Sequence, residues 1–131
     1  MGMKTLPATL WLDLLGKPFF EGARGPDAYD CVGLFLEMQR RLGLPVPAWG
    51  SHARLLPEAK TQWEPVGDPQ PGDGILIYSD DPPWHLGVVT GADYMIHSHP
   101  SCGVVRERYN AFPWHNRIEG FYRWKPICCR L

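Results

Sequence analysis

Five short segments in the second half of the chain constrain its fold most strongly. They are rich in β-branched or aromatic residues, are separated by turn residues, and span residues 74–78, 85–90, 94–97, 103–108 and 120–124. Closely spaced segments of this kind are typical of antiparallel strands. We therefore expect a mostly antiparallel sheet of about five or six strands.

Helices are expected only in the first half. Residues 31–42 have apolar side chains at helical spacing and end at Gly43, and Asp30 stands before them as a predicted N-cap. A shorter amphipathic helix is expected over residues 6–15. Residues 45–71 are rich in proline and predict an irregular connection with one short helix around 55–60. Early helices and late strands favour an α+β fold, and we expect one domain over residues 1–131.

The charge and the N-terminal segment exclude several classes of partner. Thirteen basic and fourteen acidic side chains give a formal net charge of −1, without a long block of one sign that would bind nucleic acid or an anionic membrane. No segment is apolar for long enough to span a bilayer. The first residues do not resemble a signal peptide, so we expect the protein to be cytoplasmic when made.

Cys31 is the strongest candidate for chemistry. It lies at the predicted start of the 31–42 helix, where unpaired amides and the helix dipole favour a thiolate, the nucleophilic form of cysteine. The alternative is a buried cysteine that serves as a small apolar residue. Two histidines elsewhere in the sequence, His85 and His97, favour the interpretation of Cys31 as a nucleophile.

Two histidines lie at the ends of neighbouring predicted strands. His85 begins one strand and His97 ends the next, so a hairpin would bring the two rings to the same edge of the sheet. One imidazole could then act as the base for Cys31 while the other orients it. Either histidine alone could instead be an ordinary surface residue.

A metal site is the competing interpretation of this region. His97, His99 and Cys102 form an HxHxxC cluster that offers three zinc ligands. A structural zinc site needs a fourth ligand, and the remaining cysteines show no paired spacing that would supply it. We therefore expect no metal and no cofactor.

Four short motifs together resemble a known family. They are YDCVGL at 29–34, PGD at 71–73, HLGV at 85–88 and MIH at 95–97. Their order and spacing resemble the NlpC-type cell-wall cysteine peptidases, and the similarity runs from about residue 18 to residue 124. It implies a papain-like fold and hydrolysis of an amide bond in peptidoglycan stem peptides, commonly the γ-D-glutamyl-diaminopimelate bond.

The resemblance also implies roles for individual residues. Cys31 would be the nucleophile, His85 the base and His97 the orienting residue. Asp30, Phe19 and Trp84 are the candidate substrate-binding residues, and Asp30 could equally serve only as the helix cap. Phe19 departs from the tyrosine of many relatives, so a hydroxyl donor is missing at that position. Val32, too, replaces their usual serine or tryptophan.

Finer features resemble the phage and prophage branch of the family. These are GARGPDAYDC at 22–31, LGLPVP at 42–47 and GFYRW at 120–124. They imply that the protein reaches the cell wall through a virion or a release route, with phage tail proteins as further partners. Two other functions stay open, namely a tail assembly component without catalysis and an acyltransferase that uses the same thiol.

Overall fold

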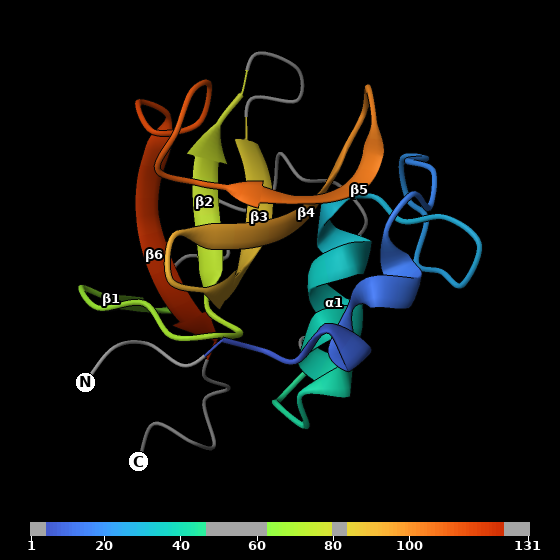
Figure 1. Cartoon of the computed structure of the whole chain (residues 1–131), viewed down its shortest axis with the longest axis horizontal. Helices are drawn as coiled ribbons and strands as arrows, with labels where there is room; N and C mark the ends of the chain where they lie inside the picture. The colour runs from blue at the N-terminus through green and yellow to red at the C-terminus, as the bar shows by residue number, and fades with distance from the viewer. Residues whose placement is uncertain (1–4, 47–62, 80–83, 125–131) are drawn as a thin grey trace.

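The described residues of the protein form a six-stranded antiparallel sheet with one α-helix packed beside it (Figure 1). The computed structural model describes residues 5–46, 63–79 and 84–124. The sheet order is β1-β6-β2-β3-β4-β5. The elements are the 3-10 turns η1 (Ala8–Leu10) and η2 (Leu12–Leu14), the helix α1 (Cys31–Arg41), and the strands β1 (Trp63–Val66), β2 (Gly74–Tyr78), β3 (Trp84–Gly91), β4 (Tyr94–His99), β5 (Gly103–Arg108) and β6 (Ile118–Trp124).

The predicted α+β architecture is confirmed, with two corrections. Each of the five predicted strands is present, and α1 covers the predicted helix. The strand β1 was not predicted, and it occupies part of the proline-rich connection. The predicted helix over residues 6–15 is wrong, because that segment forms two 3-10 turns. The predicted short helix at 55–60 lies outside the described residues.

The sheet buries both of its faces. One face packs against α1 through a core that includes Leu34, Phe35 and Leu86. The opposite face is covered by the connection between β5 and β6, where Tyr109 and Trp114 belong to a second buried cluster with Ile77 and Met95. Because both faces are covered, side chains of either orientation on the central strands are withdrawn from water.

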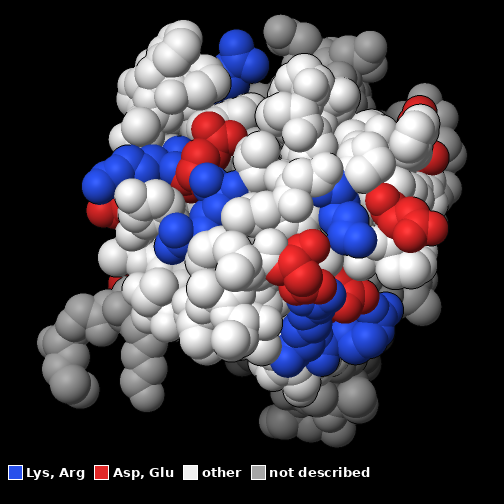
Figure 2. Space-filling model, turned by 45° about the vertical axis from the view of Figure 1, so that its right-hand side comes forward, with Lys and Arg blue, Asp and Glu red and all other residues white. Residues whose placement is uncertain are grey.

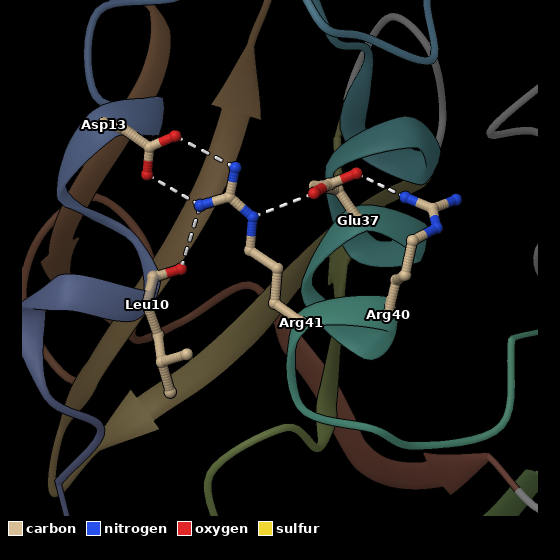
Figure 3. A network of polar contacts seen from close by, with 5 residues as sticks. All are labelled: Leu10, Asp13, Glu37, Arg40 and Arg41. Atoms are coloured by element: carbon tan, nitrogen blue, oxygen red, sulfur yellow. Dashed lines mark hydrogen bonds and ion pairs between the residues drawn. The ribbon is translucent and has the colours of Figure 1, made fainter.

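Arg41 ties the N-terminal turns to α1 (Figure 3). Its guanidinium donates to both carboxylate oxygens of Asp13, at 2.6 and 3.0 Å, to the carbonyl oxygen of Leu10 at 3.2 Å, and to Glu37 at 2.8 Å. Glu37 also pairs with Arg40. A network in which one guanidinium bridges two segments stabilises their packing more than an isolated surface ion pair does.

The PGD motif at 71–73 has a structural role. The carboxylate of Asp73 is buried, accepts from the backbone N–H of Gln70 at 2.7 Å, and pairs with Arg123 at 2.8 and 2.9 Å. It therefore joins the turn before β2 to the neighbouring strand β6.

The surface in Figure 2 shows basic and acidic side chains next to each other. That face therefore has no broad region of a single sign, which agrees with the near-zero net charge. Within the described residues, no helix is long and apolar enough to cross a membrane.

Candidate active site

The N-terminus of α1 is fixed by Asp30. This buried carboxylate accepts from the backbone N–H of Gly33 at 2.7 Å and of Gly22 at 2.8 Å, and from the Arg24 guanidinium at 2.7 Å. The first of these bonds is the predicted N-cap. The other two attach the preceding loop to the helix start, so that Cys31 occupies a fixed position in the first turn.

The thiol of Cys31 is more buried than the sequence indicated. The residue is 3% exposed, and burial raises its pKa to about 12, an effect that outweighs a backbone hydrogen bond from Leu86. The expected thiolate is therefore not the resting form of this cysteine. The bond from Leu86 places the thiol against β3, at the residue that follows His85. A base beside it must remove the proton before or during any attack.

The two predicted histidines are in contact. His85 is on β3 and His97 is on β4, and their Nε2 and Nδ1 atoms are 2.7 Å apart. Both rings are buried, and His85 has a pKa well below its usual range because burial disfavours the charged ring, with His97 nearby as a smaller cause. A neutral imidazole is in the right protonation state to accept a proton.

Glu107 completes a chain of hydrogen bonds that the sequence did not reveal. Its carboxylate oxygen is 2.6 Å from Nε2 of His97, and this contact lowers the pKa of Glu107 below its usual value. The register of β4 and β5 pairs Met95 with Glu107 and His97 with Val105. If the predicted strands on either side of the turn at 100–102 are paired as a hairpin, Glu107 falls diagonally across from His97. This pairing could have identified Glu107 from the sequence.

Two further side chains adjoin the histidine pair. The ring of Trp114 stacks over His85, with centroids 6.0 Å apart and planes at 23°, and meets the His97 ring edge-on at 5.0 Å. The ring centroid of His99 lies 5.8 Å from that of His85, and Nδ1 of His99 forms a hydrogen bond with the hydroxyl of Ser101. Trp114 therefore limits the movement of both imidazoles and reduces their contact with water.

Two of the three candidate substrate-binding residues directly precede a candidate catalytic residue in the sequence, namely Asp30 before Cys31 and Trp84 before His85. The contacts of Asp30 show its capping role, and its pairing with a substrate amine stays a prediction. Phe19 is partly buried in the segment before α1, next to Pro18, whose carbonyl accepts from the N–H of Tyr29. Trp84 directly precedes His85 and stacks on Tyr78 with centroids 4.6 Å apart. Substrate binding by Phe19 and Trp84 stays a prediction.

The zinc interpretation finds no support in the described part of the chain. Residues 5–46, 63–79 and 84–124 contain no group of three or more His, Cys, Asp or Glu side chains placed to hold a metal ion. His97 uses its two ring nitrogens for His85 and Glu107. Cys102 is exposed in the turn after β4.

Gly33 allows α1 to approach the preceding loop closely. A Cβ atom on Gly33 would lie 2.2 Å from the carbonyl oxygen of Ala23. We expect Gly33→Ala to destabilise the protein by about 1–3 kcal/mol, as overpacking commonly does, and to lower activity because the first turn must shift. Urea unfolding measures the loss. Gly67→Ala is the control, because a Cβ there meets nothing within 4 Å, and equal stability of the two variants would contradict the prediction.

A helix with a cysteine at its start, packed beside an antiparallel sheet that carries a histidine pair, fits an α+β papain-like fold. This chain belongs to the NlpC/P60 family, whose model matches residues 16–123.

Similar proteins agree with this assignment. The chain is 30% identical over 97 residues to a protein of Mycobacterium tuberculosis named "probable endopeptidase", a match that covers 74% of this chain and 24% of that protein. A protein of the same name from Corynebacterium glutamicum is 30% identical over 107 residues, with 79% and 47% covered. This chain therefore spans about a quarter to a half of these relatives.

Solved structures show the same fold. NlpC1 from Trichomonas vaginalis has a TM-score of 0.69 at 26% identity, and the match covers 89% of this chain and 42% of that one. An NlpC/P60 family protein from Bacillus cereus has a TM-score of 0.66 at 21% identity, with 95% and 42% covered. The second likeness concerns the fold alone.

Proposed function

We propose that this protein is a cysteine hydrolase that cleaves an amide bond in the peptide stems of peptidoglycan. The observations that support it most directly are the buried Cys31 thiol at the start of α1, which packs in one cluster with Leu86 of β3, and the contact between the buried rings of His85 and His97. Membership of the NlpC/P60 family and relatives named "probable endopeptidase" support the same reaction class. The γ-D-glutamyl-diaminopimelate bond is the proposed target, and it rests on the family resemblance.

The proposed mechanism has two steps. His85 takes the thiol proton as the sulfur of Cys31 attacks the amide carbonyl, and the amine then leaves with that proton, which produces a thioester. Water, deprotonated by His85, hydrolyses the thioester and regenerates the thiol. The backbone N–H of Cys31 belongs to the first helical turn, whose amides have no acceptor within the helix, so it is available to the oxyanion.

The resting protonation states fit this order of events. Burial raises the pKa of Cys31 to about 12 and holds that of His85 well below its usual range, so both groups are neutral near pH 7. Burial disfavours a Cys31 thiolate paired with a His85 imidazolium before substrate binds, because both charged groups would be withdrawn from water. Proton transfer is therefore expected together with attack on the carbonyl.

The test is cleavage of purified peptidoglycan and of a short γ-D-glutamyl-diaminopimelate peptide. We expect new amino groups from both substrates, with product masses that identify the bond, and none from the Cys31→Ala protein. Release of different fragments from the wall would change the assigned bond only.

Two other outcomes would contradict the proposal. Transfer of the acyl group to an added amine, in place of hydrolysis, would indicate an acyltransferase. A folded wild-type protein that cleaves neither substrate would favour the role in phage tail assembly.

A further inference from the structure

The chain of hydrogen bonds from Glu107 to His85 has a direction. A carboxylate accepts hydrogen bonds and donates none, and the contact with His97 lowers the pKa of Glu107, so the group is ionised near pH 7. Nε2 of His97 lies 2.6 Å from this carboxylate and must supply the hydrogen atom. In a neutral ring, Nδ1 of His97 is then the acceptor.

The direction continues to the next ring. Nδ1 of His97 lies 2.7 Å from Nε2 of His85, and since His97 accepts there, His85 donates. A neutral His85 with its hydrogen on Nε2 has its free electron pair on Nδ1. Nδ1 of His85 is thus the nitrogen that can take a proton from a thiol.

The sheet holds this chain of groups in place. On β4, Met95 and His97 point to the same face, and on β5 so do Val105 and Glu107. With Met95 opposite Glu107 in the register, Glu107 is the diagonal neighbour of His97, within reach of a long side chain. His97 is 0% exposed, whereas the side chain of Glu107 is 37% exposed, so the carboxylate reaches the buried ring from the surface.

We propose that Glu107 is a positioning residue of the active site: through His97 it fixes the tautomer of His85 and so selects Nδ1 of His85 as the base. This proposal rests on the proposed thiol chemistry and adds a fourth group to it. Trp114 is stacked over His85 and lies edge-on to His97, so it restricts rotation of both imidazole rings away from their hydrogen bonds.

The kinetic test compares three variants on the peptidoglycan peptide. Glu107→Ala should lower kcat by about 10- to 100-fold, by analogy with the loss of the carboxylate partner of a metal-bound histidine, with KM changed by less than about twofold. Glu107→Gln should recover part of the loss, because its amide oxygen still accepts from His97 but its amide nitrogen can also donate. Glu119→Gln is the control, since this carboxylate on β6 accepts instead from Tyr122, and it should match the wild type.

A second measurement does not depend on turnover. Nitrogen-15 NMR of the histidine rings should show wild-type His85 and His97 protonated at Nε2, and Glu107→Ala should redistribute the hydrogen of His97 between its two nitrogens. This result would support the hydrogen-bond chain from Glu107 through His97 to His85 even if no peptidoglycan cleavage were detected. Wild-type His85 protonated at Nδ1, or a Glu107→Ala protein with unchanged tautomers and unchanged kcat, would overturn the proposal.

Discussion

Replacing Cys31 with alanine is expected to remove peptidoglycan hydrolysis, with a loss of at least about 10³-fold, as is usual for a covalent nucleophile. The fold should survive. The substitution deletes one buried sulfur atom, whose thiol is neutral near pH 7, so the cost is a small cavity of about 1 kcal/mol. For a chain of this size we expect the melting temperature to fall by less than about 5 °C.

Cys102→Ala is the matched control for this variant. Cys102 is exposed in the turn after β4, so its replacement should leave both activity and melting temperature unchanged. Amine release from peptidoglycan and thermal unfolding, measured on all three proteins, separate a catalytic loss from a folding loss. A folded Cys31→Ala protein that still hydrolyses the substrate would remove Cys31 from the mechanism.

The strands could be predicted because their apolar and aromatic residues are grouped between turn residues. The edge strand β1 escaped prediction because it has only four residues and contains Pro65. Proline cannot donate a ladder hydrogen bond, but an edge strand needs donors on one side only. The sheet order places β1 at the edge, paired with β6 alone.

The N-terminal segment shows how a tertiary contact overrides helical periodicity. In an α-helix over residues 6–15, the N–H of Leu14 would bond to the carbonyl of Leu10. Here the N–H of Leu14 bonds to the carbonyl of Trp11 instead, and the carbonyl of Leu10 accepts from Arg41. The partner is 31 positions away, so no local pattern could reveal it.

The sequence suggested the residue types of the candidate active site, but it could not predict their electrostatics. The sequence predicted that a helix start and a hairpin would bring Cys31, His85 and His97 together, and the contact of the two histidines confirms the hairpin part of that prediction. It also predicted a thiolate, because the position of a helix start can be read from a sequence. The depth of burial cannot be read in this way, and it is burial that raises the pKa of Cys31.

Replacing His85 with glutamine is expected to lower kcat/KM by about 10²- to 10⁴-fold, the usual contribution of a general base. Glutamine is close in length and retains a nitrogen that can donate to Nδ1 of His97, so the packing around the ring should be kept. His115→Gln is the matched control, because His115 is an exposed histidine, and its activity should stay within about twofold of the wild type. Equal activity of the two variants would exclude His85 as the base.

The same variant should change how stability depends on pH. Burial holds the pKa of His85 well below its usual 6.5, so between the two values the unfolded chain binds more protons than the folded protein. Stability is then complete above about pH 6.5 and is lost as the pH falls toward the folded pKa, by at most about 1.4 kcal/mol per pH unit for one group. His99, whose pKa burial also lowers, adds a slope of the same sign. Urea unfolding between pH 6.5 and pH 5 should therefore show a shallower decline for His85→Gln than for the wild type, and parallel curves would mean that His85 is protonated equally in both states.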